Sequence, residues 1–552
     1  MINFEPITLE QKNKYEEYLS TSREHGCEYS FSNLFMWGKQ KAAFLHENIV
    51  LFSEFDSYCF YPFPIGSGNK KDVLDAIIAD AKERGLSLCL TGLNANDKAL
   101  LEQLYPGAFY FHADRSNYDY VYNIHDLADL KGRKLHRKRN HLKHFKKNHP
   151  DYIVEPISTE NIHKVKEFLS SWYQSKIEDN PEEDYHNEQA ALEKALSNYE
   201  ALKLEGLLLK ENDEVLGFTM ASQISHNTFD VHYEKARGDV DGAYTTINSE
   251  FANYIRNKYP HIEFLDREED MGIPGLRKAK ESYFPHHLIH KYRALPLTQT
   301  YEYSDASTIN EDALRNLWKE AFGDSDAFLD QFFLTGFQND HCRIATVNGT
   351  LASALYWFDC EVEGQRIAYI YGVATAKEFR GKGACHLLLT DTHNHLKELG
   401  YHSVMLVPGN ESLIHLYEGV EYEICTKISK LECSANDMGL GLYEISSSEY
   451  AILRRDFLPK LGVLQEQKNL DFLETQAKFY TGENILLCAS IENENLYGIE
   501  LLGNVDFAPG ILHALGCKDG TFRTPGKDMP FAMFHPLTED AIEPGYFGFA
   551  FD

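Results

Sequence analysis

A short turn, Arg380–Cys385, carries residue types that hold phosphate groups. Gly381 and Gly383 lack a Cβ atom, so the chain can take positive φ angles there and a phosphate can approach several backbone N–H groups. Arg380 and Lys382 add positive charge beside them. A strand-like run precedes the turn and a helix-like run follows it, so the helix N-terminus adds about half a positive charge. The pattern predicts a pyrophosphate site, with a tight strand-to-helix connection as the alternative.

The segment around this turn, about residues 300 to 430, resembles the GCN5-related N-acetyltransferase (GNAT) family. The family signature is Gln/Arg-x-x-Gly-x-Gly/Ala after the fourth strand. Arg380 and Gly383 match its first two fixed positions, and Cys385 stands at the third. The resemblance implies a splayed strand end at Val373 and Thr375 that holds pantetheine, with an N–H near Val373 polarising the thioester carbonyl. It further implies that acetyl-CoA, or another acyl-CoA, places its pyrophosphate on the backbone of Arg380, Gly381, Lys382, Gly383, Ala384 and Cys385.

Tyr417, in the run HLYEG, falls where the GNAT family has a tyrosine that protonates the departing thiolate. A phenol has suitable chemistry for that role, although packing on the sheet is the alternative. The helix ending that reads Gly-Phe in the family reads Glu421-Tyr422 here. The predicted strand 366–375 contains no glutamate, so no general base is assigned. On the preceding strand, Asp359 and Glu361 are expected to be solvated surface residues.

Acidic and basic residues are interleaved in two segments of the front half, FDVHYEKA (229–236) and LDREEDMGIPGLRKAK (265–280). Such clustering predicts either a polar site that orients a substrate and shuttles protons, or a self-neutralised structural network. The residue pattern leaves both interpretations open.

These segments, with GAYTTINSEFANYI between them, resemble the C-terminal catalytic region of phosphatidylglycerol lysyltransferase, a tandem pair of GNAT-like lobes, over about residues 1 to 293. Related members transfer an amino acid from aminoacyl-tRNA to an amine or hydroxyl acceptor. The lipid-modifying enzymes carry an integral membrane portion that is missing here, so the resemblance favours a soluble small-molecule or peptide amine as acceptor. The predicted substrate-binding residues in the matching segments are His232, Lys235, Asn248, Arg267, Glu268, Asp270, Arg277 and Lys280.

A basic run, residues 131–147, contains nine Lys or Arg, three His and no acidic residue. As a helix it would bring Leu135, Arg139, Leu142 and Phe145 to one side. One interpretation is a helix that packs two lobes together, with its basic side matched to acidic neighbours. The other is a docking face for tRNA, coenzyme phosphates or an anionic headgroup.

Composition limits the class of protein. The 552 residues are 43% hydrophobic and 25% charged, which is the mixture of a globular chain, and the net charge of −30 disfavours non-specific binding to nucleic acid or anionic membranes. No apolar run of membrane-spanning length and no export signal is present, so we expect a cytoplasmic protein. Ten scattered cysteines indicate buried reduced thiols. Without HExxH or paired CxxC spacing, the sequence predicts no metal site.

The length predicts three or four domains. Polar or proline-containing stretches between better-patterned segments divide the chain into four regions. We expect a GNAT-like lobe at 1–130, a second at 131–295 and a GNAT acetyltransferase domain at 300–435. An α/β region at 436–552 is expected to be a degenerate GNAT-like lobe. The expected fold class is α/β (α+β), with several GNAT-like acyl-CoA N-acyltransferase lobes whose central mixed sheets are flanked by helices. The function predicted is acyl transfer, with acetyl-CoA-dependent N-acetylation in the third region. A non-catalytic scaffold that binds an aminoacyl-tRNA or a phosphorylated ligand is the alternative.

Overall fold

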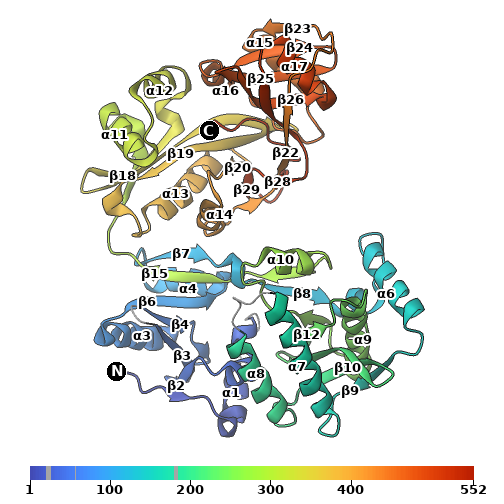
Figure 1. Cartoon of the computed structure of the whole chain (residues 1–552). Coiled ribbons are helices and arrows are strands. Elements are labelled where there is room, and N and C mark those ends of the chain that lie inside the picture. The colour runs from blue at the N-terminus through green and yellow to red at the C-terminus, as the bar shows by residue number, and fades with distance from the viewer. Residues whose placement is uncertain (20–25, 56–57, 180–184, 552) are drawn as a thin grey trace. The chain divides into compact units, whose positions relative to one another are not determined.

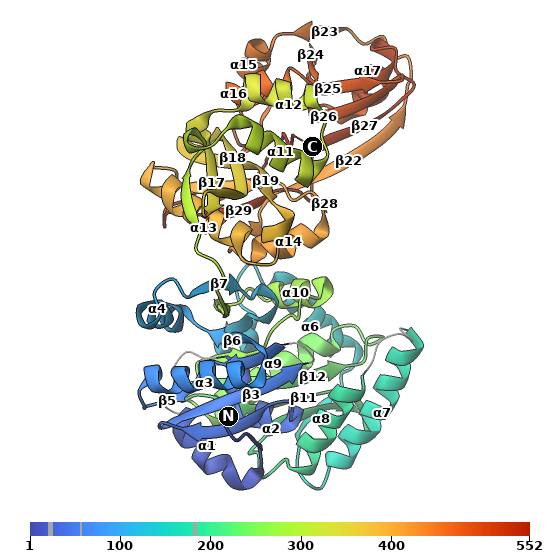
Figure 2. The same ribbon diagram turned by 90° about the vertical axis from the view of Figure 1, so that its left-hand side faces the viewer.

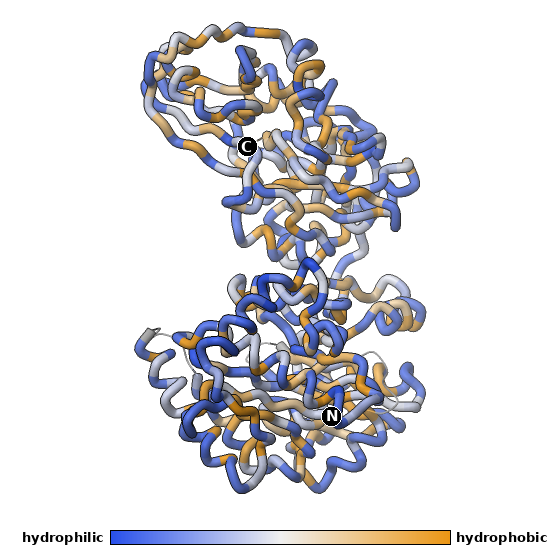
Figure 3. The backbone as a smooth tube through the Cα atoms, turned by 90° about the vertical axis from the view of Figure 1, so that its right-hand side faces the viewer, coloured by the Kyte–Doolittle hydropathy of each residue, from blue (hydrophilic) through white to orange (hydrophobic). Residues whose placement is uncertain are grey.

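In the computed structural model, which describes residues 1–19, 26–55, 58–179 and 185–551, the strands pair into mixed sheets flanked by helices. The chain divides into unit 1, Met1–Pro296, and unit 2, Leu297–Asp552 (Figure 1). Each unit contains two of these sheets. Hydrophobic stretches run through the interior of each unit, and many of the outer turns are hydrophilic (Figure 3).

The two sheets of unit 1 are joined by an exchange of strands. Strand β8 precedes the second lobe's helices yet pairs with β13 in the second sheet, while β15 ends the unit and pairs with β6 and β7 in the first. The first sheet has the order β1 (Glu5–Pro6), β2 (Lys41–Leu45), β3 (Asn48–Phe55), β4 (Tyr58–Pro62), β6 (Ser87–Leu93), β15 (Tyr292–Pro296), β7 (Phe109–Ala113), with β5 (Ile65–Gly66) beside β3. The second has the order β14 (His287–Ile289), β8 (Asp119–Asn123), β13 (Phe264–Asp266), β12 (Thr228–Ala236), β11 (Glu214–Gln223), β10 (Glu205–Glu211), β9 (Ile153–Pro156).

Helices cover both sheets of unit 1 and bury a core that is shared between its lobes. Leu34 and Phe35 pack in the same cluster as Phe168, Leu192 and other second-lobe residues. Helices α7 and α8 lie side by side (Figures 1 and 2). The helices are α1 (Lys12–Leu19), α2 (Phe31–Trp37), α3 (Lys70–Arg84), α4 (Ala95–Leu104), α5 (Ile124–Asp129), α6 (His136–Asn148), α7 (Ile162–Asp179), α8 (His186–Ser197), α9 (Ala243–Lys258) and α10 (Pro274–Glu281).

Unit 2 repeats the arrangement, because β22 joins the fourth sheet and β29 returns to the third. The third sheet has the order β16 (Glu302–Asp305), β17 (Cys342–Val347), β18 (Thr350–Val362), β19 (Gln365–Thr375), β20 (Ser403–Leu406), β29 (Met533–Pro536), β21 (Glu423–Ile424). The fourth has the order β23 (Leu442–Ile445), β24 (Lys478–Gly482), β25 (Ile485–Glu492), β26 (Asn495–Gly503), β27 (Asp519–Pro525), β22 (Lys427–Ser434), β28 (Met529–Pro530).

The helices of unit 2 pack on both faces of the third sheet. On one face, Leu388 and Leu396 of α13 contact Ala368 and Ile370 of β19. On the other, Trp318 of α11 packs in the cluster that holds the C-terminal aromatic residues. The helices are α11 (Glu311–Phe322), α12 (Asp326–Gln331), α13 (Ala384–Glu398), α14 (Glu411–Glu418), α15 (Ser447–Phe457), α16 (Lys468–Leu473) and α17 (Ala508–Ala514).

All four sheets share one pattern of pairing among the described strands. Four antiparallel strands are followed by one parallel neighbour, in the pairs β4·β6, β12·β13, β19·β20 and β26·β27. Two further antiparallel strands complete each sheet. The mixed α/β fold class is therefore confirmed, and the recurring order of elements corresponds to a lobe topology that occurs in each half of both units.

Local signals are confirmed where turn chemistry is strict. Gly85 ends α3 at φ 71°, and Gly400 follows the C-terminal end of α13 at φ 82°. The hairpins at Asn212-Asp213, Asn348-Gly349 and Glu363-Gly364 place both of their central residues at positive φ, as tight two-residue turns require.

Two local sequence patterns do not correspond to the structure that forms. The final run GYFGFAFD alternates like a strand, but within the described residues 545–551 only Tyr546 forms an isolated bridge. This run is buried on both sides, with Phe547 and Ala550 as enclosed as Phe549, so alternation does not mark a half-exposed strand. After α13, Leu399 lies at helical spacing from the buried Leu388 and Leu396 but is 48% exposed, because the helix has already ended at Glu398.

The strand exchange also departs from the expected divisions. Strand β8 lies before residue 130 yet belongs to the second sheet, and β22 lies before residue 435 yet belongs to the fourth. Antiparallel pairing between residues far apart in the chain places them there, and no local pattern encodes it.

Candidate functional sites

A cavity of about 800 Å³ lies within unit 1, where both of its lobes supply side chains. The first lobe contributes the segment that contains α2, and the second contributes α7, α8, β12 and the turn that leads into α10. The register of β12 with β11 shifts at His232, because Met220 pairs with Tyr233 and Ala221 with Val231. The regular alternation of side chains is interrupted there, and the consecutive residues from Val231 to Lys235 all line the cavity.

His232 is surrounded by polar groups in this cavity. Its Nε2 lies 2.8 Å from Ser222 Oγ, and its Nδ1 lies 3.2 Å from Glu268 Oε1. The Nδ1 atom is also 3.4 Å from Asp230 Oδ2. Burial lowers the pKa of His232 to about 3, so the imidazole is neutral. Burial, reinforced by neighbouring acidic groups, raises the pKa of both Asp230 and Glu268 well above the usual carboxyl range.

Lys280 shapes the turn that carries Glu268. Its Nζ donates to the carbonyl oxygens of Glu268, at 3.0 Å, and of Glu269, at 2.6 Å, and also to that of Arg267. Glu268 itself has φ 57°, in the left-handed region that non-glycine residues rarely adopt. The buried ammonium therefore holds an unusual backbone conformation and keeps the Glu268 side chain at the cavity.

The other predicted residues divide into two groups. Lys235 lines the cavity, with its Nζ 2.8 Å from Glu188 Oε1 and 3.9 Å from the centre of the Trp172 ring. Arg267 Nη2 and Asn248 Nδ2 both donate to Glu234, at 2.8 and 2.9 Å.

Asp270 and Arg277 form a buried network instead. Asp270 accepts from Arg277 Nε at 2.8 Å, from Tyr120 at 2.6 Å and from Arg115 at 3.2 Å. Although burial opposes the charge, the donors from Arg277 and Tyr120 hold the pKa of Asp270 below its ordinary value. This network secures the start of α10.

Sequence reasoning missed a second polar cluster of unit 1. Lys291 Nζ lies 2.8 Å from Asp119 and 2.6 Å from Glu28. The Cys27 thiol lies 3.2 Å from Glu269 Oε2, and burial, together with Asp119, raises the pKa of that thiol well above its ordinary value. These residues come from segments far apart in the chain, so no local motif joins them.

In unit 2, the predicted phosphate turn follows a strand whose end separates from its neighbour. In the described structure β20 pairs with β19 only over Ile367–Tyr369, although β19 continues to Thr375 against β18. The turn after it is exposed, with Gly381 at φ 71° and Gly383 at φ 83°. A Cβ placed on Gly381 would meet no described atom within 4 Å, so a ligand can approach this backbone.

Side chains brace the same turn from outside. Arg380 Nε donates to the Thr375 carbonyl at 2.9 Å, and Tyr301 donates to the Lys382 carbonyl at 3.0 Å. Gly383 is the N-cap of α13, which leads into the buried Ala384 and the half-buried Cys385. The backbone N–H groups at this helix start are therefore fixed in place, an arrangement suited to an anionic group.

The family models match both units. The model of the phosphatidylglycerol lysyltransferase C-terminal region matches residues 20–295, which is half of the chain. The chain belongs to this family. A model of the GNAT acetyltransferase domain matches residues 302–425. The protein thus combines two regions related to acyltransferases.

Individual relatives and solved structures resemble parts of this chain. A conserved protein of unknown function from Bacteroides thetaiotaomicron is 39% identical, with a TM-score of 0.51, over 54% of this chain and 100% of that one. The L-PGS structure from Bacillus licheniformis is 13% identical with a TM-score of 0.41, over 54% and 94%. An uncharacterized protein of Mycoplasmoides gallisepticum is 25% identical over 32% of this chain. The matched region spans 56% of the length of that relative.

Tyr417 lies on α14, beside α13, the helix that follows the predicted phosphate turn. It is 8% exposed and belongs to the same buried cluster as Leu388, with Cys385 partly buried against that cluster. Burial raises the pKa of Tyr417 well above its ordinary value, so the phenol keeps its proton. The position after α14 where the GNAT family has glycine is Glu421, which adopts φ 64° despite its side chain.

Asp359 is paired, not merely solvated as expected. It lies 3.2 Å from His341 Nε2 and 3.4 Å from Arg366, and it also accepts from Tyr401. Although burial opposes its charge, the donors from His341 and Tyr401 lower the pKa of Asp359 to about 2.

The basic run forms α6, which packs through one side. Leu135 and Phe145 are buried, Lys138 Nζ lies 3.8 Å from the centre of the Tyr283 ring, and Lys146 pairs with Glu250 at 3.1 Å. Burial, followed by the charge of Arg267, lowers the pKa of Lys138 to about 8. The opposite side of α6 is exposed and carries Arg137, Lys143 and Lys147, and Arg133, which precedes the helix, is exposed as well.

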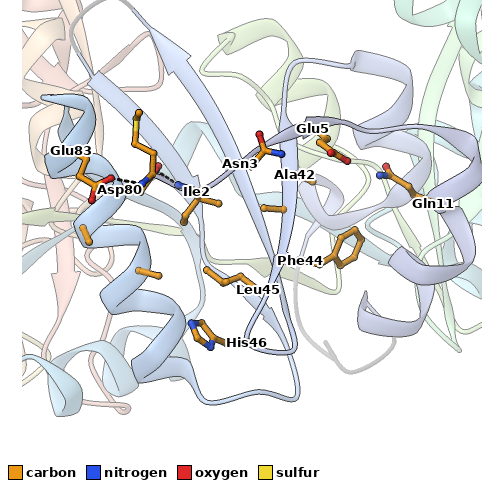
Figure 4. Close-up of a pocket in the computed structure, with 14 residues that line it drawn as sticks. Ile2, Asn3, Glu5, Gln11, Ala42, Phe44, Leu45, His46, Asp80 and Glu83 are labelled. Carbon is orange, nitrogen blue, oxygen red and sulfur yellow. Dashed lines mark hydrogen bonds and ion pairs between the residues drawn. The ribbon is translucent and has the colours of Figure 1, made fainter.

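A further cavity of unit 1, of about 620 Å³, is lined by β2 and α3 (Figure 4). Its one deeply buried acid, Asp80, accepts from Ile2 N at 2.6 Å, Tyr61 at 2.6 Å and Arg84 at 2.7 Å. Because that carboxylate is already engaged, this cavity is not a candidate for catalysis.

Among the described residues, no helix is both long and apolar enough to cross a bilayer.

Proposed function

We propose that unit 2 is an acyl-CoA-dependent N-acyltransferase that uses acetyl-CoA and acetylates a small-molecule or peptide amine. The observation that carries this proposal is the separation of β19 from β20 after Tyr369, next to the exposed turn at the N-terminus of α13. The separated strand end offers backbone groups for pantetheine, and the turn offers N–H groups for a pyrophosphate. The match of residues 302–425 to the GNAT domain supports the same assignment.

The chemistry follows from the placement of these groups. The acceptor amine attacks the thioester carbonyl, and an N–H near Val373 stabilises the oxyanion by about 2.7 to 4 kcal/mol, the effect of one good donor. The amine gives up a proton to solvent water, the C–S bond breaks, and the thiolate receives the phenolic proton of Tyr417. The tyrosinate then regains a proton from solvent.

For unit 1 we propose transfer of an aminoacyl group from aminoacyl-tRNA to a soluble amine in the 800 Å³ cavity. Two observations favour it. The cavity gathers His232, Lys235, Arg267, Glu268 and Lys280 from separate segments. The exposed side of α6 carries cations that can contact phosphates of a nucleic acid.

One experiment separates catalysis from binding in unit 2. The purified chain is incubated with acetyl-CoA and a panel of amines, and free coenzyme A and acetylated products are quantified by mass spectrometry. We expect thiol release that depends on the amine. Affinity for acetyl-CoA without release would instead identify the scaffold function, and absence of affinity would overturn the assignment of the turn.

The unit 1 proposal needs its own measurement. The chain is incubated with aminoacyl-tRNA carrying a labelled amino acid, together with the same amines, and transfer of label to a small product is followed. We expect transfer that is lost in Lys235→Ala but retained in Gly383→Asp, because those residues belong to different units. Loss of transfer in both variants, or in neither, would contradict the proposal that unit 1 carries out the aminoacyl transfer independently of the unit 2 turn.

A further inference from the structure

We propose that Asp230, His232 and Glu268 form a binding site for a divalent transition-metal ion at the wall of the unit 1 cavity. One ligand atom from each residue lies within 4.8 Å of the other two. The separations from His232 Nδ1 are 3.2 Å to Glu268 and 3.4 Å to Asp230. Ligands at about 2.0 to 2.2 Å from an ion stand about 3.0 to 3.6 Å apart, so these spacings suit a shared ion.

Asp230 supplies the independent observation. Its side chain is completely buried, and neither carboxylate oxygen has a hydrogen-bond partner among the described residues. Buried carboxylates are normally paired or bound to a metal, since an unpaired one is costly to remove from water. Its Oδ2 lies 3.4 Å from His232 Nδ1, and a carboxylate oxygen of Asp230 lies within 4.8 Å of the ligand atoms of both other residues.

The histidine is oriented as a metal ligand would be. Ser222 Oγ lies 2.8 Å from Nε2 and can accept a hydrogen bond from an Nε2–H group. In that tautomer the lone pair of Nδ1 faces the two carboxylates. A proton on Nδ1 would instead serve only one of them. Glu268 Oε1 also accepts from Asn33 Nδ2 at 3.2 Å, so Asp230 is the carboxylate that a bound cation would pair.

Neighbouring cations are already engaged elsewhere. Lys280 donates to three backbone carbonyls, and Lys291 binds Asp119 and Glu28. Arg267 pairs with Glu234. An ion of charge +2 would balance Asp230 and Glu268 without disturbing these pairs.

A second group of possible ligands in unit 1 fits an ion less well. Cys27, Asp119 and Glu269 also lie close together, but Lys291 Nζ is 2.8 Å from Asp119 and 3.8 Å from Cys27 Sγ. That group already contains its counter-charge. The proposed ion site is therefore confined to the group around Asp230.

The chemistry of the three residues limits the choice of ion. One imidazole and two carboxylates suit Zn²⁺ or Mn²⁺, whereas Mg²⁺ prefers oxygen ligands and retains water. His232 and Glu268 line the cavity, so the remaining coordination positions face its interior. Three protein ligands with an open position are typical of ions that contact a substrate. This site does not depend on the proposed transfer activity.

Metal binding by the full chain tests the proposal directly. The protein is stripped with EDTA, dialysed into metal-free buffer, and titrated with ZnCl₂, MnCl₂ or MgCl₂ by calorimetry, with bound metal counted by mass spectrometry. We expect one Zn²⁺ or Mn²⁺ per chain, weak binding of Mg²⁺, and a Tm that rises with bound ion. Failure of the wild type to bind either Zn²⁺ or Mn²⁺ stoichiometrically would overturn the proposal.

Variants distinguish this site from surface histidines. Asp230→Asn and His232→Gln should each lower Zn²⁺ affinity at least tenfold, and Asp230→Asn should lose the metal-dependent rise in Tm. Asp230→Asn keeps the shape of the side chain, so its metal-free Tm should not fall. The matched control is His141→Gln, which alters an exposed histidine 2.9 Å from Asp241 and should bind as the wild type does. Unchanged Zn²⁺ affinity in Asp230→Asn would contradict the assignment.

Discussion

Lys280 Nζ lies 3.0 Å from the carbonyl oxygen of Glu268, and the two residues sit on opposite sides of the turn that enters α10. The same ammonium also serves the carbonyls of Arg267 and Glu269. A single buried cation thus donates to three consecutive carbonyls of this segment. The Tyr120 N–H also donates to the Glu268 carbonyl, at 3.2 Å, so Lys280 and β8 together hold Glu268 at the cavity.

Lys280→Met should therefore destabilise unit 1. Loss of the donor leaves the carbonyls of Arg267 and Glu269 without this partner, although the Glu268 carbonyl still accepts from the Tyr120 N–H, and we expect the unfolding free energy to fall by about 2 to 4 kcal/mol. Chemical denaturation with fluorescence and hydrogen exchange at the turn measures it. The exposed neighbour Lys278→Met on the same helix is the control and should change stability little. Equal stability of both variants would contradict the role given to Lys280.

Gly383→Asp should abolish acetyl-CoA binding by unit 2. The substitution places a side chain and a negative charge at the N-terminus of α13, against the expected pyrophosphate. Gly383 also has φ 83°, so part of any effect is backbone strain. Gly349→Asp is the matched control, because Gly349 has φ 76° in a hairpin away from the turn. Calorimetry should show binding lost only in Gly383→Asp.

Tyr417→Phe separates proton transfer from packing. If the phenol protonates the thiolate, turnover should fall by about 10²- to 10⁴-fold while acetyl-CoA affinity stays nearly unchanged. Phenylalanine fills the same buried space, so the Tm should change little. Steady-state kinetics and thermal melts measure both quantities. Wild-type turnover in this variant would leave Tyr417 with a packing role alone.

The sequence was informative where chemistry is local. Gly381 and Gly383 require positive φ in a strand-to-helix turn, and both adopt it. Hairpins with Asn or Gly, helix ends at Gly85 and the order of elements in unit 2 follow from similarly short segments.

Long-range pairing set the rest. Strands β8 and β15 each pair in the sheet of the other lobe. The hydrophobic pattern of a strand does not specify which sheet it joins, so the sequence did not predict this exchange. Asp230 stands two residues before His232 on one strand, and that spacing is visible in the sequence. Its complete burial is not, because it depends on the packing of β13 against β12. Cys27 and Lys291 likewise meet only in the folded unit.

Two sets of substitutions on α6 test the basic run. Replacing the exposed Arg133, Arg137, Lys143 and Lys147 by Gln should weaken tRNA binding and lower the logarithmic salt slope by somewhat under one unit for each lost phosphate contact, by analogy with about 0.9 for duplex DNA. The Tm should stay unchanged because these side chains lie outside the packed face.

Lys138→Gln is the counterpart on the packed face. It removes the contact with Tyr283 and should lower the Tm while leaving the salt slope nearly intact. Binding measured at two salt concentrations, with melts of each variant, separates the effects. A quadruple variant with the wild-type salt slope would exclude this helix as a tRNA contact.

His341 and Asp359 should make the stability of unit 2 depend on pH. Although burial opposes its charge, hydrogen bonds to Asp359 and Asp340 raise the pKa of His341 above its ordinary value. A group whose folded pKa is raised stabilises the fold fully below its unfolded pKa, and the contribution disappears as pH rises through the folded pKa. His341→Gln should therefore lower the Tm more at pH 5.5 than at pH 8.5, values chosen to bracket the ordinary histidine pKa of about 6.5. Arg366→Gln is the control, because Arg366 pairs with the same Asp359 and stays charged at both pH values, so its effect should be the same in each. A loss of Tm in His341→Gln that is equal at the two pH values would show that the imidazole contributes by packing against Trp357, 5.2 Å away, and not by its charge.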